Sequence, residues 1–196
     1  MRQVYKRQLK KAVHMNIFND KFASGQVIKS AGISNATLQS WLKREVIVGQ
    51  KDGSVIEGGG SPGRHRRFSF YNLIEIATAK ALIDCGVSDL QVAFSTARKF
   101  AHTGIAATKE HPERNPGMPF NISNDALGQT LLCMSGEHSF VAFWQPGTDP
   151  LLEIRTALRR PIGFVILDMN ELFDRVTASL GYHPQEVIEH AYSSSG

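Results

Sequence analysis

Two short segments separated by a single glycine constrain the fold of this chain more than any other feature. The first is predicted to form a helix capped by Ser24 and stopped by Gly32, because glycine readily takes the left-handed conformation that ends helices. Ser34 then provides an N-cap for a second helix. The apolar residues of that helix share one face: Leu38, Trp41 and Leu42. Two capped helices joined by a tight turn are typical of a helix-turn-helix motif.

The stretch after the second helix predicts a β-hairpin. Its arms are Val46–Val48 and Val55–Ile56, and the Asp52-Gly53 dipeptide between them is typical of tight hairpin turns. A glycine-rich run at 58–63 is expected to be a loop, since it offers no side chains to pack in a core. Three arginines follow this run and cannot all point inward from a hairpin: Arg64, Arg66 and Arg67.

Two longer helices are predicted downstream. Ser69 offers an N-cap for the first, which has a broad apolar face and ends near Cys85-Gly86. Asp89 and the preceding serine cap the second, which ends near Gly104. The four predicted helices together are expected to enclose an apolar core.

The distribution of charge divides the chain into two unlike parts. Residues 1–68 contain 13 Lys and Arg against 4 Asp and Glu, whereas residues 69–196 contain 9 against 14. A basic part joined to an acidic part is typical of a chain in which one end meets a polyanion. The alternative is a chance fluctuation combined with a basic arm over residues 1–21.

Four segments, in their order and spacing, resemble the winged-helix DNA-binding domain of MerR-type transcription regulators. They are FASGQVIKSAGI, SNATLQSWLKREVI, GRHRRFSFYNL and KALIDCGVSDLQVAFS, and the resemblance covers residues 22 to about 102. The resemblance implies a winged helix-turn-helix domain over residues 22–104 that binds double-stranded DNA and regulates transcription. Such regulators usually pair and read two half-sites, so a homodimer is expected.

The sequence departs from the MerR pattern at several points. Gln39 and Ser40 stand where the family usually has Arg and Tyr, and LQSWLK is closer to excisionases and to the small subunits of phage terminases, which use the same fold. The family's long dimerisation helix is not evident after Gly104, and its paired metal-sensing cysteines are absent. The alternative function is therefore an accessory factor that recruits a DNA-packaging or recombination enzyme, and metal sensing is not expected.

Candidate DNA-contacting residues form two groups. Arginine and lysine are suited to phosphate, and the candidates are the basic residues of the wing and of the end of the second helix: Arg64, Arg66, Arg67, Lys43 and Arg44. Asn and Gln can pair with adenine in the major groove. The candidates for base contacts are the polar residues of the second helix: Asn35, Thr37, Gln39 and Ser40.

Each group has a structural alternative. The wing arginines could serve only as a solvated surface, and Ser34 and Asn35 could serve only as helix caps. Trp41 is expected either to pack in the core or, as the resemblance implies, to place its edge near a phosphate.

The acidic part of the chain predicts a small α+β domain over residues 120–196, joined through a linker at 105–119. Apolar runs at Thr130–Met134 and Phe140–Trp144 predict a β-hairpin, and residues 161–167 predict a third strand. Helices are expected at residues 151–158, 168–180 and 184–192.

A domain of this size can barely bury a sufficient core by itself, so it is expected to pack on the first domain, on a second copy or on a ligand. We assign it to dimerisation or sensing, and a second protein or a small ligand remains open as a further partner. The Phe140–Trp144 strand is interpreted as a dimer edge, with a buried central strand as the alternative.

Several classes of protein are not expected. No apolar run approaches the length of a membrane span. The chain has two cysteines, Cys85 and Cys133, both in apolar surroundings, which indicates a reduced cytoplasmic protein. The seven histidines are scattered, and neither a zinc-ligand set nor a Ser-His-Asp arrangement stands out. Enzyme activity, a cofactor and a metal site are therefore not expected.

Overall fold

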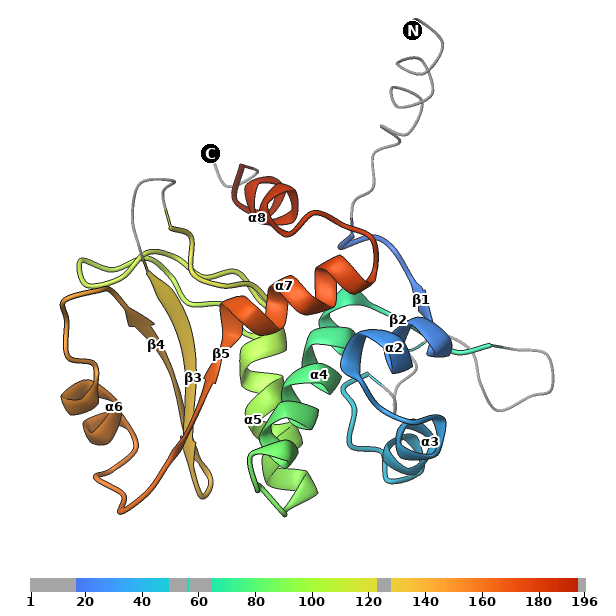
Figure 1. The fold of residues 1–196 in the computed structure, drawn as a ribbon, viewed down its shortest axis with the longest axis horizontal. Coiled ribbons are helices and arrows are strands. Elements are labelled where there is room, and N and C mark those ends of the chain that lie inside the picture. The colour runs from blue at the N-terminus through green and yellow to red at the C-terminus, as the bar shows by residue number, and fades with distance from the viewer. Residues whose placement is uncertain (1–16, 50–55, 57–64, 123–127, 194–196) are drawn as a thin grey trace, which may run out of the picture.

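The computed structural model describes residues 17–49, 56, 65–122 and 128–193. Within them the chain has seven helices and five strands, which confirms the predicted α+β class (Figure 1). None of these helices is both long and apolar enough to cross a membrane. In chain order the elements are β1 (Phe22–Ala23), α2 (Ser24–Ala31), α3 (Asn35–Lys43), β2 (Arg67–Phe68), α4 (Phe70–Asp84), α5 (Leu90–His102), β3 (Gln129–Ser135), β4 (His138–Trp144), α6 (Leu151–Ala157), β5 (Val165–Asp168), α7 (Met169–Ser179) and α8 (Pro184–Ser193).

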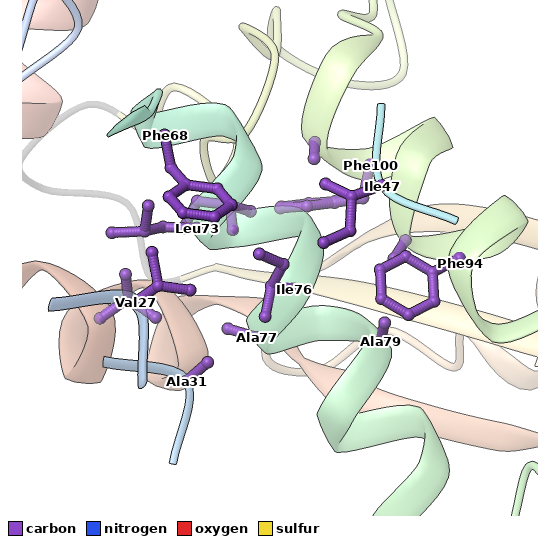
Figure 2. Close-up of a cluster of buried hydrophobic side chains, with 14 of the residues drawn as sticks. Val27, Ala31, Ile47, Phe68, Leu73, Ile76, Ala77, Ala79, Phe94 and Phe100 are labelled. Atoms are coloured by element: carbon purple, nitrogen blue, oxygen red, sulfur yellow. The ribbon is translucent and has the colours of Figure 1, made fainter. Parts of the chain in front are cut away.

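Helix α4 is the centre of the helical part of the fold. Ten of its fifteen residues are buried, so other elements cover most of its circumference, as expected for a helix with apolar residues nearly all round. Figure 2 shows Val27 of α2 on one side of this helix and Phe94 and Phe100 of α5 on the other. Ile47, which follows α3, lies beside the α5 residues in the same cluster (Figure 2).

The ends of α2 and α3 follow the predicted signals with one exception. Gly32 has a φ of +63°, a left-handed conformation, and Ser34 is the N-cap of α3. The N-cap of α2, however, is Ala23 and not Ser24. The backbone N–H of Ala23 is satisfied by the Gln26 side chain, which accepts it at 2.9 Å, so the helix can begin without a serine cap.

The hairpin predicted after α3 is only partly within the described residues. Its Asp52-Gly53 turn and the glycine run at 58–63 lie outside them. The predicted first arm, Val46–Val48, is a turn and not a strand, because its first two residues are 1% and 2% exposed and pack into the helical core. Strand β2 pairs instead with β1, which places Phe68 opposite Phe22.

A three-stranded antiparallel sheet forms the other part of the fold, with β3 between β4 and β5. The predicted hairpin and third strand are confirmed, but the third strand begins at Val165, later than predicted. Helices α5 and α7 contact one face of the sheet, and α6 lies against the other (Figure 1). The predicted Phe140–Trp144 strand belongs to β4 and is an edge strand, which excludes the alternative of a central strand.

One hydrophobic core extends through both parts. Leu132 of β3 and Phe173 of α7 belong to the same buried cluster as Leu73 of α4. Phe70 and Phe173 meet edge to face, with 6.1 Å between their ring centroids. Ile17, which the sequence interpretation assigned to the basic arm, is 1% exposed and belongs to this core as well. The small domain therefore packs on the first domain, one of the three partners considered for it.

The predicted linker at 105–119 is anchored by a buried arginine. Arg114 is 2% exposed, and its Nη1 donates to the carbonyl oxygens of Phe100 at 3.1 Å and Met118 at 3.4 Å. Its Nη2 donates to the carbonyl oxygen of Thr103. Because α5 ends beside these groups, the cation offsets the partial negative charge of the helix C-terminus. Burial lowers the pKa of Arg114 to about 10.

Candidate nucleic-acid interface

Helix α3 presents a polar, partly basic face to solvent. Its orientation is fixed by Leu38 and Leu42, which are 0% and 2% exposed on the opposite side of the helix. Figure 1 shows α3 and the β1–β2 pair at the end of the molecule remote from the three-stranded sheet. The exposed residues of α3 and its C-cap include five of the ten predicted DNA contacts: Asn35, Gln39, Ser40, Lys43 and Arg44.

Two amide side chains lie one turn apart on this face. Gln39 Nε2 donates to Asn35 Oδ1 at 3.4 Å, which orients the two groups relative to each other. The Gln39 oxygen is left as an acceptor and the Asn35 nitrogen as a donor, and no other side-chain hydrogen bond joins either amide to the described part of the chain. Adenine offers a matching donor and acceptor, N6–H and N7, at its major-groove edge. The pair therefore has the chemistry needed to read a base.

The start of α3 separates capping from contact residues. Ser34 Oγ accepts the backbone N–H of Thr37 at 3.0 Å and lies 2.8 Å from Thr37 Oγ1. Ser34 is thus the cap, and Asn35, the first helical residue, is exposed and is not needed as a cap. Thr37 is half-buried and belongs to this capping network, so it is a weaker candidate for a base contact than Asn35 or Gln39.

Trp41 belongs to the core. It is 6% exposed, and its ring meets Phe94 of α5 edge to face with 5.1 Å between centroids. Of the two roles considered for Trp41 this burial favours packing, and we do not retain the residue among the DNA contacts.

A buried carboxylate fixes the chain that leaves α3. Glu75 of α4 is 0% exposed, and its two oxygens accept the backbone N–H of Val48 at 3.1 and 3.2 Å. Asn72 donates to the Val48 carbonyl oxygen at 3.1 Å, and His102 Nε2 lies 3.1 Å from Glu75 Oε2. These bonds tie the segment after α3 to both α4 and α5. In the sequence Glu75 is a lone carboxylate within the apolar run of α4, but the sequence does not indicate which groups it would hydrogen-bond.

A polar hollow of about 370 Å³ adjoins the C-terminal end of α3. Arg44 and Arg98 line it together with Gln91 and the turn at 47–49. Arg98 of α5 is exposed, and its Nη2 donates to the Val46 carbonyl oxygen at 3.3 Å, which directs the guanidinium toward the end of α3. Sequence reasoning missed Arg98, because only the packing of α5 beside α3 brings it next to Arg44. The Glu45 carboxylate lines the same hollow, so its side chains carry a net charge of +1, and the two guanidinium groups are the ones that could bind an anion such as a phosphate.

The predicted wing lies only partly within the described residues. Arg67 is exposed on β2, because the next residue of the strand, Phe68, is fully buried and successive strand residues point to opposite faces. Arg66 is half-buried, and Arg64 lies outside the described residues. At least one of the three predicted wing arginines therefore faces solvent on the same part of the fold as α3.

The remaining reactive side chains of the described residues include potential metal ligands and two cysteine thiols. Across the described ranges, no three His, Cys, Asp or Glu side chains are grouped so that they could hold a metal ion. Cys133 is buried, and burial together with the nearby Glu153 charge raises its pKa to about 12. Cys85 is exposed at the end of α4. In comparisons with known proteins, no family model and no curated protein sequence matches the chain.

Proposed function

We propose that this protein is a sequence-specific DNA-binding transcription regulator, in which residues 22–102 act as a winged helix-turn-helix of the MerR type. The observation that carries the proposal is the exposed Asn35–Gln39 pair on a short capped helix with Lys43 and Arg44 at its end. Phosphate contacts from the basic groups would position the helix, and the amides would read base edges.

Selection of bound sequences from a random DNA pool with the purified protein tests this proposal. A regulator enriches one motif, and a specific site binds at least about a thousand-fold more tightly than random DNA. A protein that enriches no motif and shows no salt-dependent affinity for DNA is a binding module of another kind, and the proposal is then wrong.

One observation favours a second candidate, a DNA-packaging or recombination accessory factor. Helix α5 ends at His102, and the chain continues through the segment anchored by Arg114 instead of a long dimerisation helix. An accessory factor would form a stable complex with a terminase or recombinase on DNA, whereas a regulator would need no enzyme partner. Co-purification with such an enzyme, combined with low sequence selectivity, would support this candidate over the regulator.

The wing arginines are expected to control the salt dependence of DNA binding. The Arg66→Ala/Arg67→Ala variant should bind all DNA sequences more weakly, and each lost phosphate contact should reduce the slope of log K against log salt by about 0.9. Titration at several salt concentrations measures this slope. The matched control, Arg155→Ala/Arg175→Ala, removes the same charge from exposed positions on α6 and α7. Its slope of log K against log salt should equal that of the unmodified protein. Equal slopes for the wing variant and the unmodified protein would exclude phosphate contacts by these residues.

Gln39 is expected to affect sequence preference and not general affinity. The Gln39→Ala variant should lose discrimination at one or two base pairs by about 1–3 kcal/mol, because one half of the amide pair is removed. Competition titrations with single-base variants of the selected site measure the effect. If Gln39→Ala weakens binding to every sequence equally, Gln39 serves to position the backbone and does not read a base.

A further inference from the structure

Strand β4 lies at an edge of the three-stranded sheet, and no other strand in the described part of the chain pairs with its outer side. It pairs with β3 in unbroken register over seven residue pairs, from Ser135 opposite His138 to Gln129 opposite Trp144. Within the described residues, no backbone hydrogen bond is made from its other side. Six of its seven residues are half-buried, as expected for a strand that packs on its faces but has no neighbour along one edge.

This edge lacks the features that normally protect an exposed strand. Natural edge strands are short, bulged, or interrupted by Lys or Pro, because unpaired N–H and C=O groups are a template for another strand. The β4 sequence, HSFVAFW, contains no Lys, Arg, Asp, Glu, Pro or Gly, and its register with β3 has no bulge. The opposite edge, β5, has only four residues, ends in Asp168 and passes directly into α7. The two edges are therefore not equivalent, and β4 is the one suited to pairing.

The side chains of β4 are complementary to those of a second, antiparallel β4. Val141 belongs to the face that packs on the helical core, and Phe140 and Ala142 belong to the face that packs on α6. In an antiparallel pair centred on Val141, Ala142 lies opposite the partner's Phe140, and Ser139 lies opposite the partner's Phe143. Phe140 and Phe143 thus each meet a small residue on the same face, and Trp144 lies opposite the partner's His138. The strand itself carries no carboxylate or ammonium group, and one ammonium group, Lys99 Nζ, lies 3.2 Å from Ser139 Oγ.

We propose that β4 pairs with β4 of a second copy of this chain about a two-fold axis, which creates a continuous six-stranded antiparallel sheet. The two-fold axis is perpendicular to the sheet, so both helical parts lie on the same side of it. The inference is carried by the sheet alone and does not require DNA binding. If the protein also binds DNA as proposed, the dimer presents two copies of α3 from one side, as a site with two half-sites requires.

The test is the mass of the full-length protein in solution. Light scattering at micromolar concentration should give twice the 21.6 kDa of one chain. The Ser139→Glu variant should raise the dimer dissociation constant at least about ten-fold, because the small residue opposite the partner's Phe143 becomes a large one whose carboxylate loses part of its hydration there. In the monomer the same carboxylate faces Lys99, whose Nζ lies 3.2 Å from Ser139 Oγ, so the variant is expected to keep its fold. Circular dichroism checks that it does.

A matched control locates the interface. Ile166→Glu adds the same charge to β5, at a residue already 42% exposed, and should leave the dimer intact. Should Ser139→Glu not fold, His138→Glu at the end of β4 provides the second seam variant. A protein that is monomeric at high micromolar concentration overturns the proposal, as does a dimer that Ile166→Glu dissociates and the β4 variants do not. A monomer that selects a DNA motif would contradict only the dimer, and a dimer without DNA affinity would contradict only the proposed function.

Discussion

Replacement of Arg114 by Met is expected to lower the free energy of unfolding by about 3–5 kcal/mol, which is near the upper end for a single substitution. Methionine fills much of the same volume but cannot donate, so the carbonyl oxygens of Met118 and Thr103 lose the donor that Arg114 gives them. The Phe100 carbonyl oxygen keeps only the backbone N–H of Gly117. Each buried acceptor left unpaired costs about 1–3 kcal/mol. The variant also loses the packing of the guanidinium over the Phe100 ring, at 4.6 Å from its centroid.

Urea unfolding followed by circular dichroism measures this effect. Arg98→Met is the matched control, because Arg98 is exposed and makes a single hydrogen bond to a backbone oxygen; it should cost less than about 1 kcal/mol. Arg114→Lys should be intermediate, since an ammonium group is a point donor and cannot reach carbonyls on several sides. A loss below 1 kcal/mol for Arg114→Met would show that the segment at 105–119 is not anchored by this side chain.

The parts of the fold that were predicted correctly have local causes. Ser34, Ser69, Asp89 and Asp168 each cap the helix that follows, because a cap depends only on a short side chain and the next few backbone N–H groups. The β3–β4 hairpin likewise joins two apolar runs that are close in sequence. The spacing of the buried residues of α3 determines which of its faces is exposed, so the exposure of Asn35 and Gln39 could be predicted from the sequence.

The parts that were missed depend on contacts between distant residues. Arg114 stands in a segment with several prolines, where composition predicts a linker, and its role exists only because α5 ends beside it. Arg98 reaches the end of α3 only through the packing of α5. Val46–Val48 has a strand-like composition, but burial of its first two residues in the helical core overrides that preference.

The largest expected effect on both stability and DNA binding in one variant comes from Glu75. Glu75→Ala should lower the free energy of unfolding by about 2–4 kcal/mol, because it leaves the Val48 N–H without its buried acceptor and removes the carboxylate that lies 3.1 Å from His102 Nε2. The same change releases the chain that follows Arg44, so affinity for the selected DNA should fall about ten-fold or more even where the variant is folded. Thermal unfolding and DNA titration on one sample measure the two effects.

The Glu75→Gln variant separates the loss of the negative charge from the loss of side-chain volume and hydrogen bonds. Glu75→Gln keeps an oxygen for the Val48 N–H and places an NH₂ group toward His102, whose ring nitrogen can accept it in one tautomer. It should therefore retain most of the stability and of the DNA affinity that the alanine variant loses. Glu153→Ala, at an exposed position on α6, controls for removal of a carboxylate and should stay within about 0.5 kcal/mol. Full DNA affinity in a folded Glu75→Ala protein would mean that the buried carboxylate stabilises the core but does not position the end of α3.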